Sequence, residues 1–255
     1  MSIFVTGDVH GVAEYGATRF SSRAWPLGRT LTRDDVVIVA GDFGFIWSGS
    51  NTDKYWLDWF ESKPWTTCFV DGNHENHRLL AGLPMREWNG GLVHKARPHV
   101  LHLMRGEVFD IAGTTVLAMG GAASHDKQWR QEGKTWWPEE MPSEREMNHC
   151  RASLDRVGWK VDYVVTHEAP VDLADELCME CNREFYDDSL QAFWASSTGG
   201  STTAPGFLAI TMTMNGAMTS IALSTKILCR SKCDVPTSRV RLRVAILSKS
   251  VRRSP

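Results

Sequence analysis

Runs of apolar residues alternate with amphipathic stretches along most of the chain. The apolar runs predict β-strands within residues 2–6, 34–42, 66–75, 100–106, 107–113, 114–121 and 161–170. Apolar residues at helical spacing predict helices over 12–25, 53–62 and 142–157. The opening order of strand, helix, strand, helix, strand is typical of a parallel sheet built by crossover connections. We therefore expect an α/β fold whose functional loops follow the carboxyl ends of the strands.

The composition changes abruptly near Trp194. Residues 1–194 carry 29 acidic and 19 basic side chains, whereas residues 195–255 carry 1 and 9. All 11 tryptophans and all 9 histidines lie in the first part, and 18 residues of the second part are serine or threonine. These differences predict one folded domain over 1–194 and an atypical basic tail over 195–255.

The composition disfavours several classes of protein. The chain opens directly on an apolar strand and has no apolar run near the roughly 18 residues of a membrane-spanning helix, so we expect a soluble cytoplasmic protein with no membrane partner. Cys178 and Cys181 form a CxxC pair, but Cys229 and Cys233 have a different spacing, which favours unpaired thiols over a zinc site. The cations of the tail are scattered without aromatic residues between them, which disfavours nucleic-acid binding.

Four predicted strands end in loops that carry metal-ligating side chains. These side chains are Asp8, His10, Asp42, Asn73, His74 and His167. Carboxylate, imidazole and amide groups suit Mn, Fe, Zn or Mg ions, and one carboxylate can bridge two ions about 3.5–4 Å apart. A single acidic residue after a strand is equally typical of a helix cap. The recurrence at four strand ends, with glycines that permit tight turns, instead predicts a metal site.

The same loops resemble the sequence blocks of a known family. They contain D-V-H-G, G-D-F-G, G-N-H-E and T-H-E-A-P, within residues 5–12, 41–44, 71–77 and 163–170. In this order they resemble the calcineurin-like metallophosphoesterases, whose blocks are D-x-H-G, G-D, G-N-H-E and a later histidine. The resemblance covers about residues 1–194. It implies an α/β sandwich of two central, mostly parallel or mixed sheets flanked by helices, which in this chain is disrupted after about residue 194.

The resemblance also implies a chemistry and a role for each residue. Five side chains would be metal ligands. Asp8 and His10 would hold one ion, Asp42 would bridge the two ions, and Asn73 and His167 would hold the other ion. His74 would stabilise the transition state or protonate the leaving oxygen. The implied cofactors are two divalent ions, manganese first, with iron, zinc or magnesium as alternatives. The implied reaction is hydrolysis of a phosphate ester by water or hydroxide held between the ions.

Two further features bear on the substrate. His125 and Arg130 follow the strand over 114–121 and are candidates for substrate binding, because a guanidinium beside the ions would bind phosphoryl oxygens. A solvated charged turn explains the same residues equally well. Asp42 is followed by F-G-F-I-W rather than the D-R-G of phosphoprotein phosphatases, which weakens that assignment. The implied substrate is therefore a small phosphomonoester or phosphodiester.

One block of the family, G-H-x-H, is missing, because no histidine follows His167. Its loss would remove one imidazole from each ion. When the codons of Leu208–Thr219 are read from the third base of Leu208, they permit Gly-His-Tyr-His-Asp-Asp-Glu, and the methionine codons force an Asp and the Glu. The preceding A-P-G-F-L permits Trp-Phe-Phe in the same frame. We hypothesise that the residues from about 195 onward are an out-of-frame translation, and we expect such a tail to pack poorly.

Two functions fit these observations. The first is a dinuclear phosphoester hydrolase that is impaired in this chain by the loss of G-H-x-H and fully active in the restored frame. The second is a catalytically inactive relative that at most binds phosphate ligands. Metal-dependent turnover of an aryl phosphate distinguishes the two.

Overall fold

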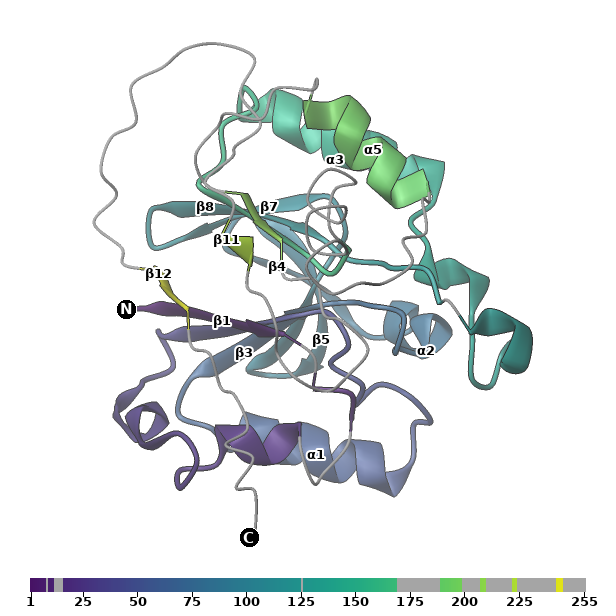
Figure 1. Ribbon diagram of the computed structural model, residues 1–255. Coiled ribbons are helices and arrows are strands. Elements are labelled where there is room, and N and C mark those ends of the chain that lie inside the picture. The colour runs from purple at the N-terminus through teal and green to yellow at the C-terminus, as the bar shows by residue number, and fades with distance from the viewer. Residues whose placement is uncertain are drawn as a thin grey trace, which may run out of the picture.

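Two β-sheets lie face to face between layers of helices (Figure 1). The computed structural model describes residues 1–7, 9–11, 16–124, 126–168, 189–198, 207–209, 222–223 and 242–244. Within these residues the chain forms the predicted α/β sandwich of two mixed sheets flanked by helices.

The first sheet contains seven strands in the order β12-β1-β2-β3-β6-β5-β4. Their bounds are Ile3–Gly7 (β1), Val36–Ala40 (β2), Thr66–Val70 (β3), Met85–Trp88 (β4), Gly91–Arg97 (β5), Val100–Leu103 (β6) and Leu242–Val244 (β12). β12, β1, β2, β3 and β6 run parallel, whereas β5 and β4 add an antiparallel edge. The parallel sheet predicted from the opening strands is thus confirmed, and β1, β2 and β3 end at one common edge.

The second sheet contains five strands in the order β11-β10-β9-β8-β7. Their bounds are Glu107–Ile111 (β7), Thr114–Met119 (β8), Tyr163–Thr166 (β9), Phe207–Ala209 (β10) and Ala222–Leu223 (β11). β7 and β8 form an antiparallel hairpin, and β8, β9 and β10 run parallel. The remainder of the predicted tail lies mostly outside the described residues.

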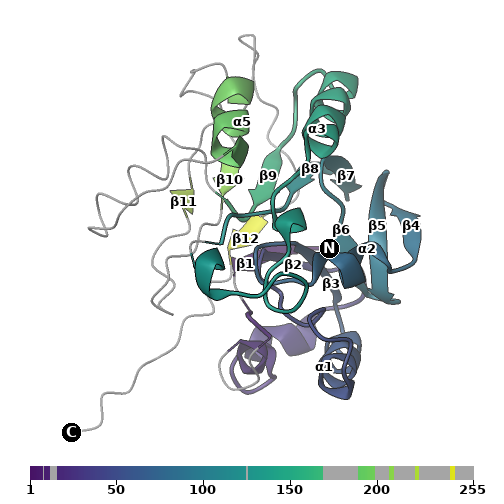
Figure 2. The same cartoon turned by 90° about the vertical axis from the view of Figure 1, so that its right-hand side faces the viewer.

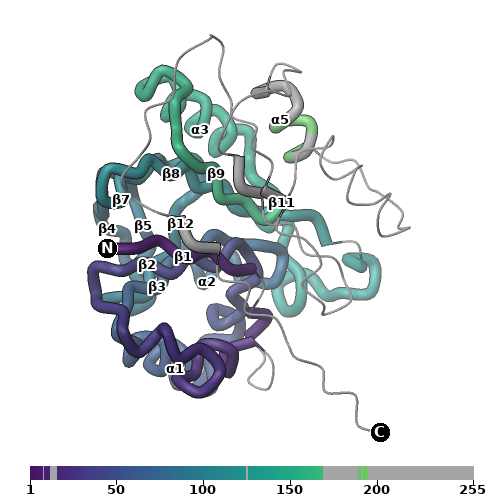
Figure 3. The backbone as a smooth tube through the Cα atoms, turned by 60° about the vertical axis from the view of Figure 1, so that its left-hand side comes forward, coloured from purple at the N-terminus to yellow at the C-terminus, as the bar shows by residue number. Residues whose placement is uncertain are grey.

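Helices cover the outer faces of both sheets (Figures 1 and 2). α1 (Asn51–Glu61) covers the first sheet, and α3 (Glu144–Arg156) and α5 (Ser189–Thr198) cover the second; the tube in Figure 3 shows the same layers. In the described part of the chain there are also the short α2 (His77–Ala81) and four 3-10 helices: η1 (Ala17–Phe20), η2 (Pro26–Thr30), η3 (Lys127–Trp129) and η4 (Pro138–Glu140). α3 begins with a capping box between Ser143 and Glu146, which satisfies backbone N–H groups at its first turn.

The strands β1, β2, β3 and β6 of the first sheet are buried on both faces. Phe4 of β1 packs toward α1, whereas its neighbours Ile3 and Val5 pack between the two sheets. Side chains alternate between the faces of a strand, so a strand with helices on one side and a sheet on the other must be apolar throughout. This burial explains why the sequence shows uninterrupted apolar runs that end abruptly in polar loops.

The helix predicted over residues 12–25 is wrong in its described part. Residues 12–15 lie outside the described residues, and the segment that follows contains only η1 and a turn before η2. Phe20 and Trp25 both pack into the core under the first sheet, with the Trp25 ring 5.2 Å from that of Phe4. The backbone at Ser21 is extended, with φ −67° and ψ 153°, so the helical segment ends between the two rings.

Two other predictions concern cysteines and membranes. Cys68 and Cys150 are buried free thiols, whereas the CxxC pair lies outside the described residues. Of the helices in the described part of the chain, none has the length and apolar character needed to cross a bilayer.

Candidate metal centre

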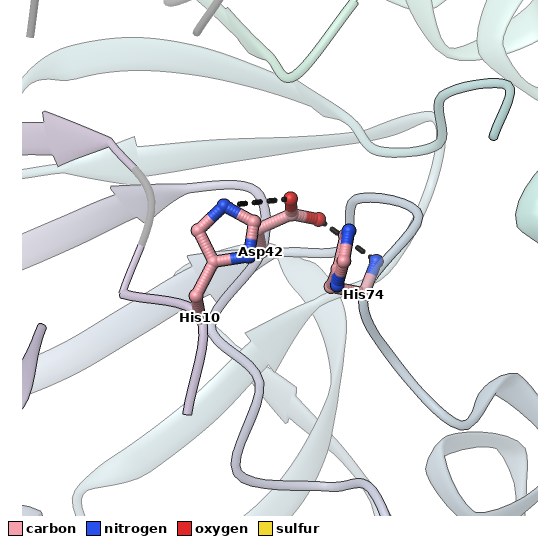
Figure 4. Close-up of side chains that lie close together, drawn as sticks. All are labelled: His10, Asp42 and His74. Carbon is pink, nitrogen blue, oxygen red and sulfur yellow. Dashed lines mark hydrogen bonds and ion pairs between the residues drawn. The ribbon is translucent and has the colours of Figure 1, made fainter. Parts of the chain in front are cut away.

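The predicted ligand loops meet where strands of both sheets end. His10 follows β1, Asp42 follows β2, His74 follows β3 and His167 follows β9. Ligand atoms of His10, Asp42 and His74 all lie within 4.8 Å of one another (Figure 4). The topology thus brings together groups that lie far apart in the sequence.

Asp42 is the central group of this cluster. Its Oδ2 lies 3.5 Å from Nε2 of His10 and 3.5 Å from Nε2 of His167, which belongs to the loop of the other sheet. Its Oδ1 accepts a hydrogen bond of 2.8 Å from the backbone N–H of His74 (Figure 4). The residue is only 3% exposed. A buried carboxylate between two imidazoles is a set of donors that could hold a cation.

The tautomer of His167 leaves one ring nitrogen available to a metal. Its Nδ1 lies 3.1 Å from the carbonyl oxygen of Ala40. A carbonyl oxygen can only accept, so Nδ1 carries a proton, and Nε2 is the ring nitrogen that faces Asp42 and could bind a metal. Metal-ligating histidines commonly have their other ring nitrogen fixed in this way.

The backbone at the site adopts conformations that most residues avoid. His10 has φ +55° and Asp42 has φ +48°, both in the left-handed region. Gly41 has φ +86°, and a Cβ at this position would collide with the ring of His167. Such conformations persist only where the surrounding structure fixes them, and they concentrate at functional sites.

The electrostatics of the cluster favour an ionised Asp42 and a neutral His74. Burial alone would raise the pKa of Asp42, but His167, His74 and His10 together hold that pKa below its usual range. Burial lowers the pKa of His74 from 6.5, against the opposing effect of Asp42. Metals bind deprotonated carboxylates and neutral imidazoles, so both shifts favour cation binding.

His74 is flanked by a cation and an aromatic ring. Nη2 of Arg130 lies 3.2 Å from Nε2 of His74, and Nε of Arg130 pairs with Oδ1 of Asp126 at 2.7 Å. Trp47 stacks beside the imidazole with ring centroids 6.3 Å apart, and Trp137 supports Trp47 edge-on. The sequence singled out Arg130, and the structure places its guanidinium at the cluster.

The comparison with protein families agrees with these observations. Residues 1–197 match the model of the calcineurin-like phosphoesterases. The chain belongs to this family. Calcineurin-like phosphoesterases hydrolyse phosphate esters and generally bind two divalent metal ions. A search of curated proteins found no match.

The calcineurin-like donor set suits hard and borderline divalent ions. One carboxylate and two imidazoles come from Asp42, His10 and His167, and His74 lies in the same cluster. The Asn73 amide directly precedes His74 in sequence. These donors fit Mn, Fe, Zn or Mg. The structure places His74, predicted as a catalytic group, in one cluster with Asp42 and the predicted ligand His10. Asp8 and His125, predicted as ligand and substrate contact, lie outside the described residues.

Sequence reasoning missed the residues that fix the loops. Glu75 is fully buried and accepts hydrogen bonds from the N–H groups of Gly44 and Gly72, at 3.0 and 2.8 Å. It therefore ties the loop of Asp42 to the loop of Asn73. Burial and the charge of Asp42 raise the pKa of Glu75 to about 8. Its place in the G-N-H-E block was the one signal in the sequence, whereas nothing in the pattern marked Trp47.

Proposed function

We propose that this chain is a metal-dependent phosphoester hydrolase with a two-ion centre, acting on a small phosphomonoester or phosphodiester. The observation that carries the proposal is the buried Asp42 carboxylate between the imidazoles of His10 and His167, which come from different sheets. Family membership supports the same reaction class.

The proposed ligands are those implied by the sequence. Asp8 and His10 would hold one ion, Asp42 would bridge, and Asn73 and His167 would hold the other. Manganese is the first candidate for both positions. The exposed face of the cluster supports access by substrate, since the His10 side chain is 39% exposed whereas Asp42 is enclosed.

The residues around the ions have distinct proposed tasks. Bound divalent ions would activate water and neutralise charge on the phosphoryl oxygens. His74 would stabilise the charge that develops on the phosphoryl group or protonate the leaving oxygen. Arg130 has five N–H donors, so it can contact both His74 and a phosphoryl oxygen. The ion pair with Asp126 holds Arg130 in place for that contact.

We also propose that the regular catalytic-domain sequence ends near Trp194 and that the tail is an out-of-frame translation, of which three short strands, β10, β11 and β12, still join the two sheets. The end of the family match at residue 197 supports this boundary. The described strand β10 adds support, because it runs parallel to β9 with Ala209 opposite Thr166. In the shifted frame the aromatic run falls on the codons of β10, and G-H-x-H begins at Ala209. This position lies beside the end of β9, the strand that His167 follows.

An assay of metal-dependent turnover tests the proposal. The full chain is loaded with manganese and given an aryl phosphate and a bis-aryl phosphodiester. We expect turnover that chelation removes and that Asp42→Asn or His74→Ala reduces by at least about 100-fold, the effect typical of removing one group that stabilises developing charge. Asp34→Asn changes an exposed acid and is the matched control.

The same measurement decides between the two functions. Turnover that survives Asp42→Asn would contradict the proposed centre. No turnover, together with fewer than one bound metal per chain, would instead identify an inactive relative that at most binds phosphate ligands.

A further inference from the structure

The two ends of the Asn73 side-chain amide have opposite chemistry. The carbonyl oxygen can bind a cation, whereas the NH2 group can only donate hydrogen bonds. Nδ2 of Asn73 lies 3.2 Å from Oγ of Ser124. With the NH2 group on Ser124, the carbonyl end is the one left for a cation.

Ser124 can accept this hydrogen bond because its own proton is used elsewhere. Its Oγ donates to Oε2 of Glu140 at 2.6 Å, and its backbone N–H donates to Oε1 of the same carboxyl group at 2.8 Å. Ser124 and Glu140 are each only 2% exposed, so water does not compete for these bonds. Because a carboxylate only accepts, it fixes the hydroxyl proton toward Glu140 and the oxygen lone pairs toward Asn73.

Glu140 is itself anchored to the loop that carries Asn73. Nη2 of Arg105 donates to the backbone oxygens of Glu139 and Glu140, both at 3.0 Å, and Nε of Arg105 donates to Oδ2 of Asp71 at 2.9 Å. Asp71 directly follows β3 and precedes Asn73 by two residues. The hydrogen bonds therefore close a ring that begins and ends on the Asn73 loop.

We propose that Ser124 and Glu140 are positioning residues that hold the Asn73 amide with its oxygen toward the metal. This inference rests on the proposed function, in which Asn73 is a ligand. Each bond in the relay has one defined direction, from the NH2 group to the hydroxyl and from the hydroxyl to the carboxylate. Reversing one bond should therefore reverse the next.

Glu140→Gln tests the direction of the relay at nearly constant volume. The Gln oxygen would keep the bond from the backbone N–H of Ser124, and its NH2 group would then donate to Oγ. The hydroxyl proton would turn to Asn73, whose amide must flip to accept it. Ser124→Ala removes the acceptor altogether. Glu107→Gln is the matched control, because Glu107 is also buried but pairs with His149.

The first measurement is made on the metal-free full chain with 15N-labelled asparagine. The side-chain NH2 signals of Asn73 are assigned by their absence in Asn73→Asp. We expect their exchange with water to accelerate about 5-fold or more in Ser124→Ala and Glu140→Gln, as for the loss of one hydrogen bond, and to stay unchanged in Glu107→Gln. Signals that are identical in all four proteins would overturn the proposed relay.

The second measurement is manganese affinity of the same proteins. We expect a loss of about 10- to 100-fold in both relay variants and none in the control, the usual effect of removing a partner of a metal ligand. A changed amide with unchanged affinity would overturn the positioning role. If the wild-type chain binds no manganese, the proposed function fails, and the amide signals alone decide whether Ser124 and Glu140 orient Asn73.

Discussion

Arg130 and His74 are in direct contact, with Nη2 of the guanidinium 3.2 Å from Nε2 of the imidazole. The two residues belong to different segments, since Arg130 follows η3 and His74 follows β3. A guanidinium only donates hydrogen bonds, so Nε2 of His74 is the acceptor in this contact. The contact connects the segment between β8 and β9 to the candidate metal centre, where strands of both sheets end.

Removal of the guanidinium should weaken catalysis without unfolding the protein. Arg130→Ala is expected to lower kcat/KM by roughly 10- to 100-fold, because a hydrogen bond to a charged group contributes about 1.5–3 kcal/mol. Asp126→Asn should have a smaller effect in the same direction, since Arg130 keeps its charge but loses its ion pair. Steady-state kinetics on both aryl substrates measures these changes.

Arg145→Ala is the control for Arg130→Ala, because Arg145 is an exposed arginine on α3. Equal kcat/KM for the Arg130 and Arg145 variants would show that the guanidinium beside His74 has no part in the reaction.

The buried pair of Asp71 and Arg105 should contribute strongly to stability. The Asp71 side chain is 1% exposed and the Arg105 side chain 7%. Arg105→Met would leave the carboxylate without its cation and is expected to lower the free energy of unfolding by about 3–5 kcal/mol. Urea unfolding of the metal-free protein measures this loss.

A surface ion pair serves as the comparison. Asp58 is 67% exposed and pairs with Arg97. Asp58→Ala should change the free energy of unfolding by no more than about 1 kcal/mol. If Arg105→Met costs no more than this, the buried network does not stabilise the fold.

The buried His77 and the half-buried His94 predict that stability falls in mild acid. Burial lowers the pKa of His77 and of His94 from 6.5 to about 4. Between these two pH values the unfolded chain binds more protons than the folded one, so stability is lost as the pH falls from about 6.5 to about 4. His77 faces Asp71, and His94 faces His102 at 3.0 Å between their Nδ1 atoms.

Urea midpoints measured across this pH range test the prediction. His94→Gln removes one titrating group and should make the dependence of stability on pH shallower. A variant with the same slope as the wild-type protein would show that His94 is not protonated on unfolding.

The sequence predicted those parts of the fold that depend on local patterns. The apolar runs marked strands correctly because β1, β2 and β3 are buried on both faces. The helix prediction over 12–25 failed because it used only the apolar spacing of the segment, which suits a helix. In the structure, Phe20 and Trp25 are held by contacts with the core under the first sheet. No local pattern records such contacts.

The same distinction applies to the site. His10, Asp42 and His167 could be singled out because each ends a strand, and the topology then brings them together. Ser124 and Glu140 could not, because their pairing depends on where η4 packs against the loop after β8. Groups that orient a ligand are thus harder to predict than the ligand itself.

The last prediction concerns the reading frame. A one-base insertion between codons 195 and 205 would restore the Gly-His-Tyr-His sequence. β10 ends with Ala209 opposite Thr166, so the restored block would begin at the edge where His167 lies. Each ion would then gain an imidazole, and we expect two bound metals per chain, with higher turnover than the chain as encoded.

The control is the same repaired gene with both restored histidine codons changed to alanine, which keeps the new frame but removes the two donors. Higher metal content in the repaired chain than in this control would assign the gain to the imidazoles rather than to better packing of the tail. Resequencing codons 190 to 215 provides an independent check on the natural gene. An intact frame there, together with a repaired chain that binds no more metal than the original, would contradict the displaced frame, because the position of β10 beside β9 would then have no bearing on metal binding.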